Sequence, residues 1–433
     1  MKALIISHNP MSTRYSIGKT LLSLFSSFKK EELGQLYIHT GKPEFDVCSS
    51  FYQVTDKDVL DGLFKRKVRS REVFVNKEPE VVGADKCYKK TCGSFRNRAP
   101  YRQLLRDCIW KLSPWYSKEL KAWICSQHFT CIFVAIGSGT FLYNIALKIS
   151  KDFKLPLYTY VCDDFYSLAP PKKPLGFIWK KHLMAKTEKL LSHSAAIVTI
   201  CEEMSRLYQD TFGRPTYTVM TGSNYSLAEK PLYKDNLQTI RYFGKVSLNR
   251  YKALADIGRE LDKLNVERNT KYGLEIYSDG INEKVKKEFA GVASTKFCGY
   301  VSGEEFEKKF FSADALLHVE AFDKGSIDRV RHSISTKIAD GMASGIPMFA
   351  YGPDSVASIK HLLQNESAFV ATDKIQLKDK LSSLFLVGEE RLEVVGRAIK
   401  TAEKYHNAKS VSQVIYDLLN SSVDKDQNGR IWK

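Results

Sequence analysis

The chain lacks the segments that carry a protein into or across a membrane. It contains no uncharged apolar run of about 18 residues, so the sequence predicts no transmembrane helix. The first 30 residues also lack a signal-peptide pattern, because the short apolar stretch 1–7 is followed by a polar stretch, 8–16, and by no cleavage site. We therefore expect a cytoplasmic protein.

A disulfide framework is also missing. The 9 cysteines are odd in number and are scattered through expected strands and helices, which favours reduced thiols. Cys87 and Cys92 form the closest pair, but no second pair or histidine follows at zinc-finger spacing. The sequence therefore predicts no metal site.

Several catalytic and nucleotide-binding motifs are absent. There is no G-x-S-x-G, no H-E-x-x-H and no G-x-G-x-x-G. Gly18 and Lys19 are followed by a threonine, as in a P-loop, but Thr13 occupies the place of the first P-loop glycine, which excludes that NTPase class. Gly18 either allows a ligand to approach the backbone at a helix start or simply begins the helix.

Acidic residues are scarce in one stretch, Lys65–Arg106. It holds 13 Lys or Arg against four acids, so it carries +9 of the chain's net charge of +17. Its Gly, Pro and Asn content predicts a loop or insertion, which is either a solvated linker or a contact with an anionic membrane surface. No recognition motif points to nucleic acid. The flanking helices expected at 101–112 and 115–127 carry aromatic residues that suit either a membrane surface or the core.

Buried strands alternate with amphipathic helices along most of the chain. This alternation predicts an α/β fold with doubly wound parallel sheets. The pattern stops near 221–235 and then restarts, which indicates domains at 1–225 and 236–400. Helices are expected at 401–433, and we expect them to return toward the first domain. The expected strands are 2–7, 36–39, 131–137, 155–161, 195–200, 240–246, 273–280, 295–301, 315–319, 348–350 and 367–371.

The stretch Ser312–Tyr351 predicts an anion site. A buried strand, 315–319, leads into a polar loop, and a capped helix begins near Ser335. Free backbone N–H groups and the helix dipole favour negative charge at such a helix start. On the other domain, Asp163 and Asp164 follow the strand 155–161, where they either contact a ligand or cap a helix.

These motifs occur in an order that resembles a known family. Phe243-Gly244-Lys245 is followed by Arg250, by FCGYVSGEEFEKKFFSADALLHVE, by Ser333–Ile338 and by GMASGIPMFAYGP. The series resembles the donor half of GT-B nucleotide-sugar glycosyltransferases, in particular the glycosyltransferase 4-like group of bacterial surface-polysaccharide biosynthesis. The NP…GKTL start and the YVCDDFYS segment are similar to that group's acceptor half.

The resemblance implies a GT-B architecture, with two Rossmann-like domains facing across a cleft. It also implies transfer of a sugar from a UDP- or GDP-sugar to a glycan or lipid-linked acceptor, as in capsule, exopolysaccharide or lipopolysaccharide synthesis. The reaction would retain the anomeric configuration and would need no metal or other cofactor. A location on the inner face of the cell membrane would follow, with Lys65–Arg106 as the membrane contact.

Roles carried over from the family fall on single residues. Arg250 would clamp the diphosphate, helped by Lys337 and by the hydroxyls of Ser335 and Thr336, while Asp340 would hold the ribose hydroxyls. Tyr300 would contact the nucleobase, and Glu320 would contact the sugar. Asp163 or Asp164 would act as a general base or orient the donor. The donor site would also be lined by Gly18, Gly244 and Asn249.

Two positions depart from the family pattern. His332 stands where the family's E-x7-E signature has its first acid, and its second acid is the shorter Asp340. A non-catalytic binding or scaffold protein of the same fold therefore remains an alternative. A nucleotide-sugar epimerase, which would need no acceptor, is another.

Overall fold

The computed structural model describes residues 1–65, 70–74, 99–223, 225–232, 234–386 and 388–427. Most of the basic stretch Lys65–Arg106, including Cys87 and Cys92, lies outside these residues. The chain divides into two compact units. Unit 1 comprises Met1–Val219 and Val411–Lys433, and unit 2 comprises Met220–Ser410. None of the helices described is long and apolar enough to cross a membrane.

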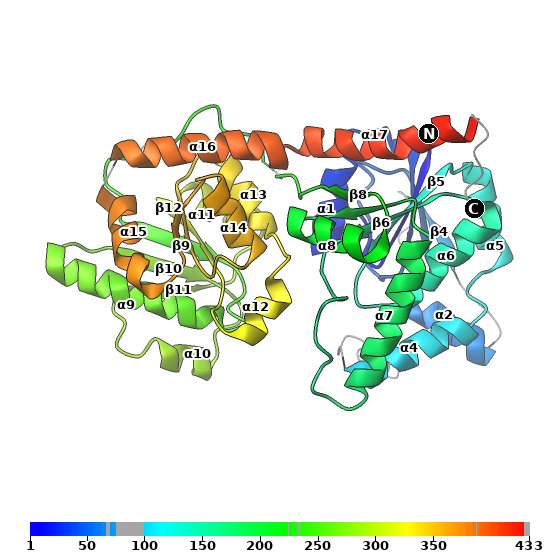
Figure 1. Ribbon diagram of the computed structural model, residues 1–433, viewed down its shortest axis with the longest axis horizontal. Coiled ribbons are helices and arrows are strands. Elements are labelled where there is room, and N and C mark those ends of the chain that lie inside the picture. The colour runs from blue at the N-terminus through cyan, green and yellow to red at the C-terminus, as the bar shows by residue number, and fades with distance from the viewer. Residues whose placement is uncertain (66–69, 75–98, 224, 233, 387, 428–433) are drawn as a thin grey trace. The chain divides into compact units, whose positions relative to one another are not determined.

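Unit 1 is built on an eight-stranded sheet with the order β4-β3-β2-β1-β5-β6-β7-β8 (Figure 1). All its neighbouring strands are parallel except β3 and β4. The strands are β1 (Ala3–Ser7), β2 (Leu33–Tyr37), β3 (Ser50–Gln53), β4 (Arg71–Val73), β5 (Cys131–Ile136), β6 (Leu157–Val161), β7 (Ala196–Thr199) and β8 (Thr216–Thr218). The helical elements are α1 (Ser16–Leu24), η1 (Lys30–Glu32), α2 (Asp56–Lys65), α4 (Pro100–Leu112), α5 (Lys118–Gln127), α6 (Phe141–Phe153), α7 (Gly176–Ser192) and α8 (Glu202–Phe212).

Unit 2 is built on a six-stranded parallel sheet with the order β11-β10-β9-β12-β13-β14. The strands are β9 (Thr239–Phe243), β10 (Gly273–Tyr277), β11 (Thr295–Gly299), β12 (Ala315–Val319), β13 (Met348–Tyr351) and β14 (Phe369–Ala371). The helices are α9 (Arg250–Arg268), α10 (Glu283–Glu288), α11 (Gly303–Phe311), α12 (Lys324–Val330), α13 (Thr336–Ala343), α14 (Ala357–Gln364), α15 (Lys374–Leu386) and α16 (Gly388–His406), and α17 (Ala408–Gln427) continues into unit 1.

Alternate side chains of these strands pack into two apolar cores, one on each face of the sheet of unit 2. Ile240 and Tyr242 pack on the side of α9, α10 and α15, whereas Phe243 packs on the side of α11, α13 and α14. A parallel sheet covered by helices on both faces is the doubly wound arrangement predicted from the alternation of strands and helices. The α/β fold class is therefore confirmed.

The structure differs from the sequence prediction between β12 and α13. The polar loop expected there contains the short helix α12, because the Asp323 carboxylate accepts a hydrogen bond from Ser326 N at 3.0 Å and caps the helix start. The helix expected near Ser335 is present, with Ser335 as its N-cap residue.

Candidate functional site

The strand order of unit 2 identifies one end of its sheet as the place for a ligand. The order reverses between β9 and β12, the first and fourth strands of this unit. In open α/β sheets, ligands bind at the carboxyl ends of the strands beside such a reversal. The relevant segments are thus those that follow β9 and β12.

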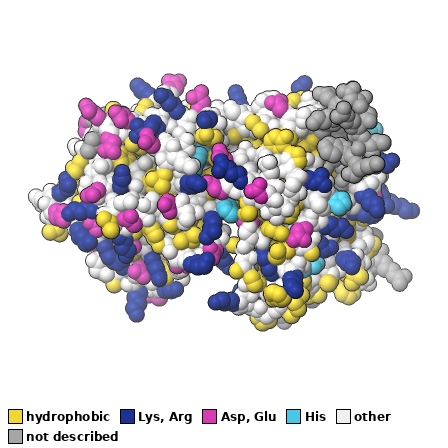
Figure 2. Space-filling view, viewed as in Figure 1, with side chains coloured by type: hydrophobic (Ala, Val, Ile, Leu, Met, Phe, Trp, Pro, Cys, Tyr) yellow, Lys and Arg dark blue, Asp and Glu magenta, His cyan; other side chains and the backbone are white. Residues whose placement is uncertain are grey.

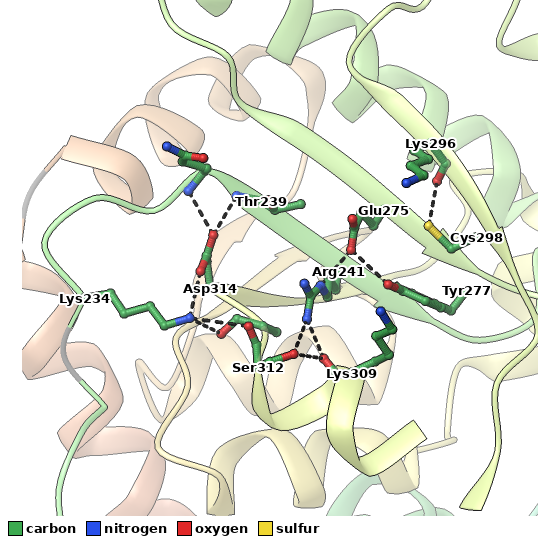
Figure 3. Close-up of polar contacts among 12 residues, drawn as sticks. Lys234, Thr239, Arg241, Glu275, Tyr277, Lys296, Cys298, Lys309, Ser312 and Asp314 are labelled. Atoms are coloured by element: carbon green, nitrogen blue, oxygen red, sulfur yellow. Dashed lines mark hydrogen bonds and ion pairs between the residues drawn. The ribbon is translucent and has the colours of Figure 1, made fainter. Parts of the chain in front are cut away.

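The opposite, amino end of these strands is closed by contacts within the unit (Figure 3). Asp314 accepts hydrogen bonds from the backbone N–H groups of Gln238 and Thr239, both at 3.1 Å, and from Lys234 Nζ at 2.8 Å. Burial opposes ionisation of Asp314, but these hydrogen bonds prevail and lower its pKa. The polar groups at this end of the sheet therefore stabilise the sheet and are not available to a ligand.

The loop between β9 and α9 has a strained backbone. Leu248 and Asn249 both adopt left-handed conformations, with φ of 55° and 56°. Asn249 Nδ2 donates a hydrogen bond to Asp323 Oδ2 at 2.9 Å, which ties this loop to the segment after β12. Left-handed backbone is unfavourable for a leucine and persists only where surrounding contacts hold it. The loop places Arg250 as the first residue of α9.

Arg250 and Glu320 form a buried ion pair across the strand reversal. Arg250 Nε and Nη2 donate to the two carboxylate oxygens of Glu320 at 2.9 and 3.0 Å. The side chains are 19% and 5% exposed. Burial raises the pKa of Glu320, and the charge of Arg250 opposes this rise. In the part of the chain that the structure describes, Arg250 Nη1 has no hydrogen-bond partner, which leaves one edge of the guanidinium to bind an anion.

His318 lies beneath this pair on β12. Its Nε2 is 3.1 Å from Ser358 Oγ and 3.5 Å from Glu320 Oε1. Burial, followed by the positive charges of Arg250 and Lys337, lowers the pKa of His318 to about 3. The imidazole is therefore neutral at physiological pH.

The start of α13 supplies the remaining groups predicted for an anion. Ser335 Oγ accepts a hydrogen bond from Lys337 N at 3.4 Å. Ser335 and Thr336 are half-buried, and Lys337 is exposed. A cation and two hydroxyls thus accompany the backbone N–H groups of this helix start, which favours a negatively charged ligand.

The other residues predicted for the donor site are more dispersed in unit 2. Asp340 is buried within α13 and accepts a hydrogen bond from Ser223 Oγ at 3.2 Å. Tyr300 follows the edge strand β11 and is exposed. Gly244 follows β9 directly, and its N–H donates to Tyr277 O at 3.1 Å. The predicted roles of these three residues stay predictions.

In unit 1, two of the residues predicted for the site, Asp164 and Gly18, make contacts within the unit itself. Asp164 Oδ1 accepts hydrogen bonds from Tyr208 Oη at 2.9 Å and from Ser167 N at 3.0 Å. Asp163, beside it, is exposed. A Cβ atom on Gly18 would lie 2.4 Å from Pro10 O, so this glycine is needed for close packing within unit 1.

Sequence reasoning missed a polar cluster at the carboxyl end of β1, where the first sheet also reverses. Arg106 Nε and Nη2 pair with Asp56 at 2.9 Å each, and Nη2 lies 3.0 Å from His8 Nε2. Burial and then the Arg106 charge lower the pKa of His8 to about 4. The position of His8 directly after a predicted strand was the available signal, because strand ends are where such sheets place polar groups.

A cavity of about 610 Å³ lies beside α9 in unit 2. Three of its charged side chains are already engaged with one another: Arg259 pairs with Asp256 at 3.2 Å, and Lys374 pairs with Asp256 at 2.9 Å. No group of three or more His, Cys, Asp or Glu side chains that could hold a metal ion occurs among the residues described. Asn249 and Asp323, which tie the loop before Arg250 to the segment after β12, also line this cavity, so the cavity adjoins the candidate site.

Comparisons with known proteins identify the fold. No protein-family model and no curated protein matches the sequence. Anabaena HepE in complex with UDP and glucose is 11% identical, with a TM-score of 0.63 over 97% of this chain and 100% of that chain. The α,α-trehalose-phosphate synthase (UDP-forming) of Burkholderia vietnamiensis is 9% identical, with a TM-score of 0.58 over 97% and 100% of the two chains. Sucrose-phosphate synthase of Thermosynechococcus elongatus is 8% identical, with a TM-score of 0.60 over 98% and 100%. The chain thus has the GT-B fold of nucleotide-sugar glycosyltransferase structures.

Proposed function

We propose that this protein is a glycosyltransferase that binds a UDP- or GDP-sugar at the carboxyl ends of β9 and β12. The observation that carries the proposal is the Arg250–Glu320 pair at the strand reversal of unit 2. Structures with the same fold bind UDP and UDP-glucose, which supports a nucleotide-sugar donor. The β-phosphate would bind the remaining guanidinium edge of Arg250.

The chemistry needs these groups because the leaving nucleoside diphosphate gains negative charge as the glycosidic bond breaks. Arg250, Lys337 and the start of α13 would stabilise that charge more strongly in the transition state than in the bound donor. Glu320 would act as a positioning residue, since its bidentate contact fixes the guanidinium plane before the donor arrives. This role differs from the sugar contact expected from the sequence.

The acceptor side of the proposal rests on unit 1. Of the two adjacent carboxylates, Asp163 is the more exposed and is the better candidate for a base or for orienting the donor sugar, while Asp164 holds Tyr208. A glycan or lipid-linked acceptor, a role in surface-polysaccharide synthesis and a retaining, metal-independent reaction follow from the family resemblance and belong to the proposal. So does contact between Lys65–Arg106 and the inner face of the cell membrane.

A panel of UDP- and GDP-sugars tests the function. A donor at 100 times its dissociation constant should stabilise the protein by about 2.7 kcal/mol, which a thermal shift detects. Release of nucleoside diphosphate that depends on an added mixture of glycolipid acceptors would show that the protein is a glycosyltransferase. Donor binding without turnover would instead favour the scaffold alternative, which His332 in place of the family's first acid keeps open. Donor conversion without an acceptor would favour the epimerase.

A further inference from the structure

A second surface, on unit 1, combines positive charge with exposed apolar side chains. Residues 165–187 include no Asp or Glu and five lysines, of which Lys172, Lys173 and Lys181 are exposed, Lys186 is half-buried and Lys180 is buried. This run covers the loop after β6 and most of α7. It is separate from the basic stretch Lys65–Arg106 that the sequence analysis singled out.

Three apolar side chains lie at the start of α7. Leu175, Phe177 and Ile178 are 48%, 61% and 55% exposed. Figure 2 shows hydrophobic side chains gathered at the lower edge of unit 1, with Lys and Arg side chains beside them. The neighbouring helix α4 packs against α7 (Figure 1). It carries two more exposed apolar side chains, Tyr101 and Leu105.

The backbone fixes this arrangement. Lys173 N donates to Pro171 O at 2.8 Å, and Gly176 N donates to Lys173 O at 2.9 Å. Leu175 adopts a left-handed conformation with φ of 60°, and a Cβ atom on Gly176 would lie 2.0 Å from Pro171 O. The turn therefore holds the Leu175 side chain at the surface, beside Phe177 and Ile178 at the start of α7.

We propose that the α7 surface, formed by Lys172, Lys173, Leu175, Phe177, Ile178 and Lys181, docks unit 1 on an anionic phospholipid bilayer. The apolar side chains would enter the headgroup region, and the lysines would contact the lipid phosphates. A second copy of the chain fits less well, because a symmetric contact would bring the same positive charges together. The proposed surface also comprises only six residues, whereas a stable protein interface has about 20–30 residues on each side.

Binding of the full chain to lipid vesicles tests this proposal. Vesicles of phosphatidylcholine mixed with an equal amount of phosphatidylglycerol should bind the protein, and vesicles of phosphatidylcholine alone should not. Lys172→Gln with Lys173→Gln should weaken binding by about fivefold per lysine. Phe177→Ser with Ile178→Ser should weaken it by at least about tenfold, because two apolar side chains are lost from the interface.

A matched control is available in unit 2. Val266 and Ile375 are 85% and 88% exposed, so the double substitution Val266→Ser and Ile375→Ser removes similar apolar surface elsewhere and should bind vesicles like the wild type. Unchanged binding by both α7 variants, with unchanged melting temperatures, would overturn the proposal. So would a wild type that binds neither vesicle. Self-association that Phe177→Ser with Ile178→Ser abolishes, without vesicle binding, would assign the surface to a second copy and overturn it as well.

Discussion

Replacing Arg250 by alanine should destabilise unit 2, because the substitution leaves the Glu320 carboxylate buried without its cation. Removing one partner of a buried ion pair costs about 3–5 kcal/mol. The side chain of Arg250 is 19% exposed, whereas that of Glu320 is 5% exposed. Since water reaches part of the pair, we expect the lower end of this range, about 3 kcal/mol in the free energy of unfolding of unit 2.

The loss should depend on pH in a defined direction. Burial raises the pKa of Glu320, and in the Arg250→Ala variant no arginine charge opposes that rise. At Glu320 the folded variant then binds a proton more readily than the unfolded chain, so the stability of the variant relative to the wild type increases as pH falls from neutral to about pH 5. The deficit relative to the wild type should therefore be largest at neutral and alkaline pH. Adding Glu320→Gln to Arg250→Ala should recover part of the loss, because it removes the orphaned charge.

The assay must report on unit 2 alone. The sequence has no tryptophan between residues 220 and 410, so tryptophan fluorescence follows unit 1 and serves as an internal control. Hydrogen exchange of peptides from β9 and β12 gives the opening free energy of unit 2. An Arg250→Ala variant within about 0.5 kcal/mol of the wild type at neutral pH would refute the energetic account of the pair.

Three further predictions concern the rest of the chain. Burial lowers the pKa of His406 to about 4, so its contribution to the stability of unit 2 should be full above about pH 6.5 and should fall toward pH 4 as the unfolded chain takes up a proton. His406→Gln should reduce the pH dependence of the opening free energy of unit 2, measured by hydrogen exchange. An unchanged pH dependence would contradict this prediction. Gly18→Ala should destabilise unit 1 by about 1–3 kcal/mol in urea melts followed by tryptophan fluorescence, because the new Cβ would meet Pro10 O at 2.4 Å. Gly137→Ala, whose Cβ would meet nothing within 4 Å, is the control, and equal losses in the two variants would count against the clash. Deleting residues 66–98 should weaken binding to anionic vesicles while sparing nucleotide binding, and unchanged vesicle affinity would remove this stretch from the membrane contact.

Much of the fold could be predicted from the sequence, because the strands of parallel sheets are short, continuous apolar runs between amphipathic helices. The strands β3, β4 and β8 were missed. They are only three to four residues long and mix polar with apolar side chains, so they lack that signal. The helix α12 was missed for a related reason, since it has seven residues and lies in a polar segment.

The candidate site could be predicted only in outline. Strand-end reasoning indicated the start of α13, and the family resemblance indicated Glu320 and Arg250 separately. The partner of Glu320 lies 70 residues earlier in the chain. Sequence spacing alone cannot show such a pairing, because it depends on the order of the strands in the sheet. The hydrogen bond from Tyr208 to Asp164 depends on tertiary packing in the same way.

Calorimetric titration with UDP and GDP, with uridine and guanosine as controls, tests the central claim most directly. One of the two diphosphates should bind to the wild type, and its nucleoside should bind much more weakly. Lys337→Ala removes an exposed side chain and should weaken diphosphate binding without affecting the fold. Arg250→Ala, combined with Glu320→Gln to recover part of the lost stability, should weaken diphosphate binding by about 2–4 kcal/mol. No binding of either diphosphate, or wild-type affinity in both variants, would contradict a diphosphate site at Arg250.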